Sequence, residues 1–138
     1  MKTGSDTKGL LTIGSSDNRI TSVGRWLRKL KMDELPQFFN ILTGKMSFVG
    51  PRPEVRKYVD LYTPEQMKVL EVKPGLTDYA SLEYFNESDV LHSFTDPEIA
   101  YINRIMPDKL ALNLKYIREA GFRNDLMIIA RTIRQIFL

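Results

Sequence analysis

The sequence lacks cysteine and has a single histidine, His92, among its 138 residues. The absence of cysteine excludes a disulfide scaffold, thiolate metal sites and a cysteine nucleophile. One histidine excludes a metal site built from several imidazoles. The sequence also lacks an apolar run of the roughly 18 residues that a membrane-spanning helix needs, and no signal-peptide pattern follows Met1. These absences predict a chain that neither spans a membrane nor carries an export signal.

The rest of the composition is that of a globular protein, with 43% hydrophobic and 27% charged residues. A chain of this length and composition is expected to build one domain with its own core. Its charge is uneven, because residues 1–31 and 104–138 are basic and residues 32–103 are acidic. Basic ends suggest a membrane surface, a phosphorylated ligand or nucleic acid, or only a solvated face. The acidic middle argues against nucleic acid as a partner.

The spacing of apolar residues predicts a mostly α single domain with a small β or extended element. Residues 1–18 are expected to be a mobile lead-in or an edge strand, and residues 19–138 to form the domain. Alternation over residues 76–84 predicts a strand or extended loop that Asp78 interrupts, and Pro107 is expected to end a helix. Helical spacing, caps and breakers predict helices over residues 23–30, 35–42, 55–62, 63–72, 97–106, 110–120 and 126–138.

The last predicted helix has an apolar face formed by Leu126, Ile129, Ala130, Ile133 and Phe137. One interpretation is a helix packed on the core. The alternative is a helix in a membrane interface, with arginines beside that face reaching lipid headgroups.

Asp33 and Glu34 are adjacent carboxylates at a predicted helix start, after a basic run that includes Arg28. One interpretation is structural, since Asp is a favoured N-cap and Glu suits the first turn of a helix. The other is chemical. A carboxylate kept ionised by nearby cations can attack phosphorus, and a neighbouring carboxylate suits Mg²⁺ together with substrate phosphates.

Arg52 lies between two prolines in Val49-Gly50-Pro51-Arg52-Pro53. Pro51 has a fixed φ, and Pro53 restricts Arg52 to extended conformations, so the guanidinium is expected on a stiff loop. A planar cation held in this way suits recognition of phosphate. A surface arginine in a proline turn is the alternative interpretation.

Together these segments resemble the bacterial sugar transferase family, the monotopic polyprenyl-phosphate phosphoglycosyl transferases that begin capsule, exopolysaccharide and O-antigen synthesis. The resemblance runs from about Asp17 to the C-terminus, and the order and spacing of the motifs make it specific. The matching segments are Arg28-x-x-x-x-Asp33-Glu34-Leu35-Pro36-Gln37, Asn40-Ile41-Leu42-x-Gly44-x-Met46-Ser47-Phe48-Val49-Gly50-Pro51-Arg52-Pro53 and Lys73-Pro74-Gly75-Leu76-Thr77.

The resemblance implies a two-step transfer at the cytoplasmic face of the bacterial inner membrane. In such enzymes the aspartate that matches Asp33 attacks the β-phosphate of a UDP-sugar, UMP leaves, and a polyprenyl (undecaprenyl) phosphate then takes the phosphosugar. The glutamate that matches Glu34 completes the catalytic pair and is associated with Mg²⁺, and the arginines that match Arg28 and Arg52 contact phosphate. The expected substrate-binding residues also include Pro51, Pro53, Lys73, Thr77 and Asn113.

The chain departs from the family pattern in three places. Members carry a re-entrant membrane helix and a Lys-Phe-Arg type segment before this region, so the chain is expected to be the catalytic portion of a longer enzyme, by itself soluble or peripheral. Many members have Gly-Trp-Ala-Gln-Val-Asn where residues 78–83 read Asp-Tyr-Ala-Ser-Leu-Glu. Some have aspartate at Asn113, which is here either a buried amide with its hydrogen bonds satisfied or a site residue.

Two other classes of function compete with an Mg²⁺-dependent transferase. A truncated domain could bind a nucleotide-sugar or a membrane partner without turnover. A nucleic-acid-binding module is suggested by the pI of about 9.2. It is disfavoured because residues 32–103 are acidic, which is unfavourable for following a phosphate backbone.

Overall fold

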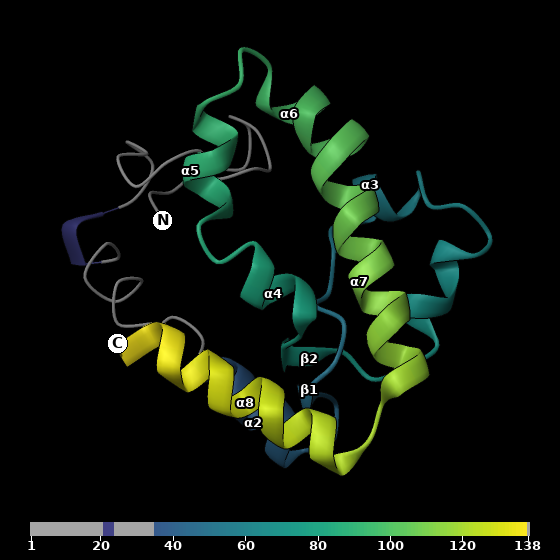
Figure 1. Cartoon of the computed structure of the whole chain (residues 1–138), viewed down its shortest axis with the longest axis vertical. Coiled ribbons are helices and arrows are strands. Elements are labelled where there is room, and N and C mark those ends of the chain that lie inside the picture. Colours follow the sequence, from purple (N-terminus) through teal and green to yellow (C-terminus); the bar gives the residue numbers. More distant parts are fainter. Residues whose placement is uncertain (1–20, 24–34, 138) are drawn as a thin grey trace.

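The computed structural model describes residues 21–23 and 35–137. In this part of the chain the fold is mostly α with one small parallel sheet, which confirms the predicted class (Figure 1). Residues 101–105 form a π-helical turn, η4, and residues 66–70 a 3-10 helix, η3. The remaining elements are α2 (Leu35–Leu42), β1 (Ser47–Val49), α3 (Arg56–Val59), β2 (Gly75–Thr77), α4 (Tyr79–Glu83), α5 (Glu87–His92), α6 (Pro97–Ala100), α7 (Met106–Glu119) and α8 (Phe122–Phe137).

The sheet joins two segments that are far apart in the sequence. Strands β1 and β2 are parallel, with Ser47 opposite Gly75 and Val49 opposite Thr77. The backbones come so close that a Cβ atom on Gly75 would lie 2.6 Å from the Cα of Gly50. A Cβ atom on Gly50 would lie 2.6 Å from the carbonyl oxygen of Lys73. Both positions therefore require glycine for lack of space.

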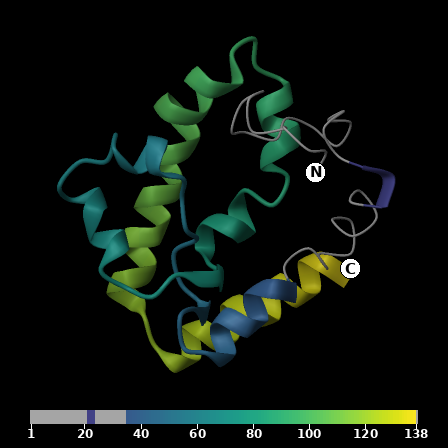
Figure 2. The ribbon, with the colours of Figure 1, turned by 180° about the vertical axis from the view of Figure 1, so that it is seen from behind.

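Two hydrophobic clusters form the core. One centres on Tyr58, Tyr101 and Met106, and the other on Val49, Tyr116 and Ile128. Helix α7 contributes to both clusters and packs against η3 and α4. Both views of the ribbon place the strands and α4 between α7 and α8 (Figures 1 and 2).

Several local predictions are confirmed. The predicted helix over residues 35–42 is α2, and Gly44 follows it with a positive φ of 74°. The predicted capping box after Thr63 forms, because the Thr63 N–H donates to Gln66 Oε1 at 2.8 Å and the Gln66 N–H to Thr63 Oγ1 at 3.3 Å. The element that follows is a 3-10 helix, and the helix expected over residues 55–62 is the shorter α3.

The prediction of an extended segment over residues 76–84 is wrong beyond Thr77. Helix α4 begins at Tyr79, and Asp78 is its N-cap, accepting a hydrogen bond from the Ser81 N–H at 2.6 Å. The polar residue that interrupts the alternating pattern therefore starts a helix.

Pro107 does not end the preceding helix, contrary to expectation. Helix α6, the π-helical turn and α7 run on from one to the next, and Pro107 lies in the first turn of α7. A proline lacks the N–H and clashes with a regular helical turn before it, and the wider π turn at that place accommodates this.

Helix α8 packs on the core through a stripe that overlaps the predicted apolar face at Ile129. Ile128 is fully buried and Thr132 is half-buried, whereas Leu126, Ile133 and Phe137 are exposed by 57%, 53% and 79%. About half of the helix's apolar arc thus faces outward. None of the helices in residues 21–23 and 35–137 is both long and apolar enough to cross a bilayer.

Candidate active site

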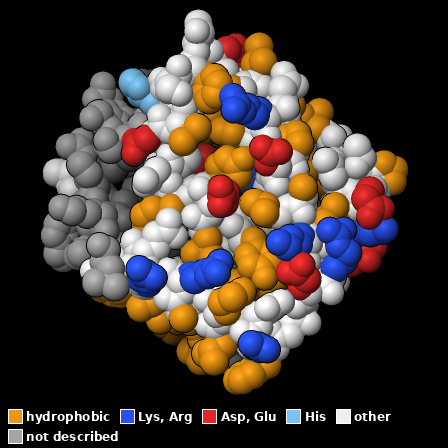
Figure 3. Space-filling model, in the orientation of Figure 1, with side chains coloured by type: hydrophobic (Ala, Val, Ile, Leu, Met, Phe, Trp, Pro, Cys, Tyr) orange, Lys and Arg blue, Asp and Glu red, His pale blue; other side chains and the backbone are white. Residues whose placement is uncertain are grey.

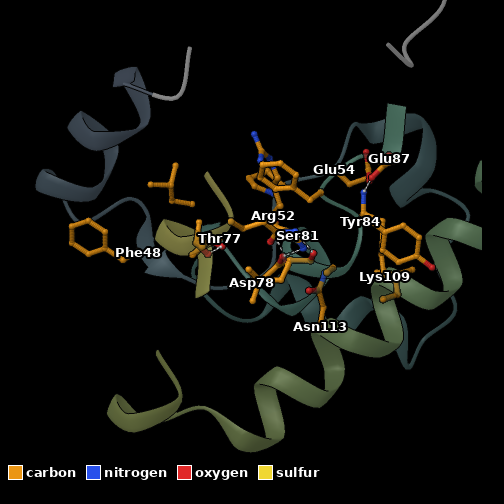
Figure 4. Close-up of a pocket in the computed structure, with 18 of the residues that line it drawn as sticks. Phe48, Arg52, Glu54, Thr77, Asp78, Ser81, Tyr84, Glu87, Lys109 and Asn113 are labelled. Atoms are coloured by element: carbon orange, nitrogen blue, oxygen red, sulfur yellow. Dashed lines mark hydrogen bonds and ion pairs between the residues drawn. The ribbon is translucent and has the colours of Figure 1, made fainter. Parts of the chain in front are cut away.

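A cavity of about 650 Å³ lies between the two core clusters. Its wall is formed by the segment after β1, by β2 and α4, by η4 and the first half of α7, and by one side of α8. Most of the wall is apolar, and its polar side chains include Arg52, Asp78, Asn113 and Lys109 (Figure 4). An apolar cavity with a few converging polar groups is typical of a ligand-binding site.

The Pro-Arg-Pro loop is fixed by its backbone. The Gly50 N–H donates to the Thr77 carbonyl at 3.0 Å, and the Gly75 N–H donates to the Pro51 carbonyl at 3.1 Å. The Arg52 N–H donates to Asp78 Oδ2 at 3.3 Å. Asp78 is fully buried, so one carboxylate holds both the loop and the start of α4.

The Arg52 side chain, in contrast, is exposed at the edge of the cavity. Figure 4 shows it directed away from Asp78 and Asn113. A guanidinium on a loop whose backbone is tied down loses less freedom when it binds an anion.

The wall beside α7 carries paired charges. Lys109 Nζ lies 2.7 Å from Glu87 Oε2 in a largely buried ion pair, and 5.3 Å from the centre of the Tyr101 ring. The Tyr101 hydroxyl donates to Glu54. Burial, followed by the charge of Glu54, raises the pKa of Tyr101 far above its ordinary value, so its hydroxyl stays protonated. Burial also raises the pKa of Tyr62 to about 12.

Thr77 connects β2 to α8. Its hydroxyl lies 2.7 Å from that of Thr132, which donates to the Ile128 carbonyl at 2.9 Å. Because the Thr132 proton is used in that bond, the Thr77 hydroxyl is the donor between the two. Tyr116 of α7 contacts both α8 and β1. Its hydroxyl is 2.9 Å from Asp125 Oδ1 on α8 and 3.3 Å from the Val49 carbonyl oxygen on β1.

The structure brings four of the predicted substrate-binding residues to one cavity: Arg52, Pro53, Thr77 and Asn113. Neither the buried Pro51 nor the exposed Lys73 lines the cavity.

The predicted nucleophile Asp33, its partner Glu34 and the predicted phosphate contact Arg28 lie outside the described residues. Within the described ranges, no group of three His, Cys, Asp or Glu side chains could hold a metal ion.

Sequence reasoning missed Asp78 as a site residue, along with Glu54, Glu87, Tyr101 and Lys109. For Asp78 a signal was present, because aspartate is a favoured N-cap residue. The pairs Lys109–Glu87 and Tyr101–Glu54 join residues 22 and 47 positions apart, and no local pattern predicts such contacts.

The sequence was also compared with known protein families and with individual known proteins. The family described as "Bacterial sugar transferase" matches residues 1–138. The chain is 35% identical over 133 residues to the uncharacterized sugar transferase EpsL of Bacillus subtilis, covering 96% of this chain and 57% of that protein.

Two relatives with named substrates are similar as well. A UDP-N-acetylgalactosamine-undecaprenyl-phosphate N-acetylgalactosaminephosphotransferase of Aeromonas hydrophila is 36% identical over 96% of this chain and 29% of its own length. A UDP-glucose:undecaprenyl-phosphate glucose-1-phosphate transferase of Escherichia coli is 34% identical over 96% and 27%. The chain spans little more than half of the first relative and less than a third of the other two. The family match over residues 1–138 shows that the chain belongs to the bacterial sugar transferase family.

Proposed function

We propose that the chain is the catalytic part of an enzyme that transfers a sugar-1-phosphate from a UDP-sugar to a polyprenyl phosphate. The observation that carries the proposal is the pairing of β1 with β2, which joins two family motifs and places Arg52 at the edge of an apolar cavity. Relatives named for this reaction with undecaprenyl phosphate support it.

The reaction proceeds in two displacements at phosphorus. The Asp33 carboxylate attacks the β-phosphorus of the UDP-sugar, an acyl phosphate bond forms, and the bond to the bridging oxygen breaks as UMP leaves. A phosphate oxygen of the polyprenyl phosphate then attacks the same phosphorus, which forms the new diphosphate and releases Asp33 as carboxylate. A covalent intermediate divides one difficult displacement into two easier ones.

The cations and carboxylates serve the diphosphate. Arg28 and Arg52 contact phosphate oxygens and stabilise the charge that develops during transfer. Asp33 and Glu34 are a donor set that suits Mg²⁺, which prefers one or two carboxylates together with substrate phosphates. When bound there, the ion neutralises diphosphate charge.

A membrane surface is the proposed location, since the acceptor is a lipid. Phe122, Leu126, Ile133 and Phe137 lie on one side of α8 and are exposed by 53% to 85%. Arg123, Arg131 and Arg134 are exposed on the same helix, and Figure 3 shows basic and apolar side chains together over this region. An apolar face flanked by arginines suits an anionic lipid surface at the cytoplasmic side of the inner membrane.

The proposal is tested by measuring UMP release from a panel of UDP-sugars with Mg²⁺ and undecaprenyl phosphate in vesicles. Asp33→Asn should reduce release by at least about 10³-fold, because the amide cannot act as the nucleophile. Asp60→Asn is the matched control, since Asp60 is an exposed carboxylate paired with Arg56 on α3, and it should keep full activity. Equal rates for wild type and Asp33→Asn would contradict the proposal.

A further inference from the structure

Asn113 has an unmet hydrogen bond at the cavity wall. It lies on α7 with 6% of its surface exposed. Among the described residues, its Oδ1 is the one buried side-chain nitrogen or oxygen that has no hydrogen-bond partner. Burying an unpaired amide destabilises a folded protein, so native structures rarely keep one without reason.

The neighbouring polar groups, in contrast, already have hydrogen-bond or ion-pair partners. Lys109 is paired with Glu87, and Glu54 accepts from the Tyr101 hydroxyl. Both oxygens of Asp78 accept backbone N–H groups. These charged groups are therefore paired. What is missing is a hydrogen-bond donor for Asn113 Oδ1, and an uncharged donor would leave these pairs undisturbed.

We propose that Asn113 Oδ1 accepts a hydrogen bond from a hydroxyl group of the sugar in the UDP-sugar. This inference rests on the proposed function and adds a residue that recognises the sugar. A pyranose offers several uncharged donors on one small ring. The nucleotide offers the ribose hydroxyls and the uracil N–H as other uncharged donors, and binding of UDP alone tests them. The two carbonyl oxygens that flank the uracil N–H would meet a wall that already carries Asp78, Glu54 and Glu87.

The positions of Arg52 and Asn113 support this orientation of the donor. Figure 4 shows them on opposite sides of Asp78, and Arg52 is exposed whereas Asp78 and Asn113 are buried. With the diphosphate at Arg52, a group attached to the β-phosphate extends past Asp78 toward Asn113. The sugar then enters the enclosed part of the cavity, where hydrogen bonds discriminate best between substrates.

The test compares two ligands and two variants by isothermal titration calorimetry, in an Asp33→Asn background so that binding is read without turnover. The probes are UDP and the UDP-sugar that the wild type uses best. Asn113→Leu should weaken UDP-sugar binding by about 10-fold or more and change UDP binding less than twofold. Its melting temperature should be unchanged or higher, because an unpaired buried amide has been replaced by an apolar group of similar size. Asn113→Asp keeps an acceptor oxygen and should bind the sugar more tightly than Asn113→Leu.

A set of deoxy-sugar donors identifies the partner hydroxyl. The donor that lacks this hydroxyl should bind the Asp33→Asn parent and its Asn113→Leu variant equally, because removing either partner removes the same hydrogen bond.

Three outcomes would overturn the inference. Equal UDP-sugar binding by Asn113→Leu would remove Asn113 from the sugar site and leave the transferase intact. An equal loss for UDP would assign the amide to the nucleotide. A large fall in melting temperature would make Asn113 structural. Absence of UDP-sugar binding to the parent protein is a different result, because it would contradict the proposed function as a whole.

Discussion

Asp78 shows how one side chain can determine the geometry of the site. Its two oxygens accept from backbone N–H groups of residues that are 26 and 3 positions away, so it fixes the arginine loop and starts α4 together. A buried carboxylate is tolerated when each oxygen is satisfied in this way. We therefore regard it as a positioning residue for Arg52.

We predict that Asp78→Asn lowers the free energy of unfolding by about 1–3 kcal/mol, because one oxygen becomes an NH₂ group that faces a backbone N–H. Urea denaturation measures this change. Asp96→Asn is the matched control, since Asp96 caps α6 with a single oxygen, Oδ1, which asparagine also has. The control should lose less than about 0.5 kcal/mol, and similar losses in the two variants would contradict the account of Asp78.

At this scale the sequence predicted some site residues and not others for a physical reason. Arg52 was predictable because two neighbouring prolines mark a stiff loop. Asn113 was left open between a buried, satisfied amide and a site residue. It is buried at the cavity wall, but its Oδ1 has no hydrogen-bond partner, so it is not a satisfied amide, and its role in the site stays a prediction. The ion pair of Lys109 with Glu87 was not predictable, because it depends on how α5 and α7 meet.

At the scale of elements, the short parallel pair is the feature on which the site depends. It brings the segments around Gly50 and Gly75 into backbone contact and so joins two motifs that are 25 residues apart. Each strand has three residues, so the pair depends on close approach and on its neighbours α4 and α8 for support.

We predict that Gly75→Ala lowers the free energy of unfolding by about 2–4 kcal/mol, because the added methyl group would overlap the backbone of Gly50. Thermal and urea denaturation measure the loss. Gly121→Ala is the control, since a Cβ atom there would meet nothing within 4 Å. It should cost less than about 1 kcal/mol. If Gly75→Ala were as stable as the control, the close approach would be unimportant.

Helix type and position were largely predictable, and the exceptions are instructive. Helix α2 follows from apolar spacing and caps, and α8 from apolar spacing, although α8 begins at Phe122 and not at the predicted residue 126. Helix α5 was not predicted. Helix α4 was mistaken for an extended segment because five residues are too few to show helical periodicity, and the cap at Asp78 was the better signal. The passage of a helix through Pro107 depends on a π turn that periodicity does not indicate.

For the whole molecule, the important relation is between the cavity and the outer side of α8. Ile133 lines the cavity and is also 53% exposed, so the apolar arc of α8 adjoins the site. If this arc rests on a bilayer, a lipid phosphate reaches the cavity from the membrane side. Apolar spacing indicated such an arc, but which half of it packs on the core is decided by the tertiary fold.

We predict that Leu126→Gln reduces binding to vesicles of anionic phospholipid by about 3-fold or more, because a leucine on the proposed membrane face becomes polar. Vesicle co-sedimentation measures the binding. Leu70→Gln is the matched control, since Leu70 on η3 is 51% exposed and Leu126 is 57% exposed. It should bind vesicles like the wild type, and an equal loss in both variants would contradict the assignment of this face.

The most direct test of the central claim is the intact mass of the protein after incubation with Mg²⁺ and single UDP-sugars, without acceptor lipid. The account predicts a mass increase of one sugar phosphate for the substrate that is used, with UMP released. The increase should be absent from Asp33→Asn and should disappear when undecaprenyl phosphate is added. An unchanged mass during UMP release, or an increase that persists in Asp33→Asn, would contradict a covalent intermediate at Asp33.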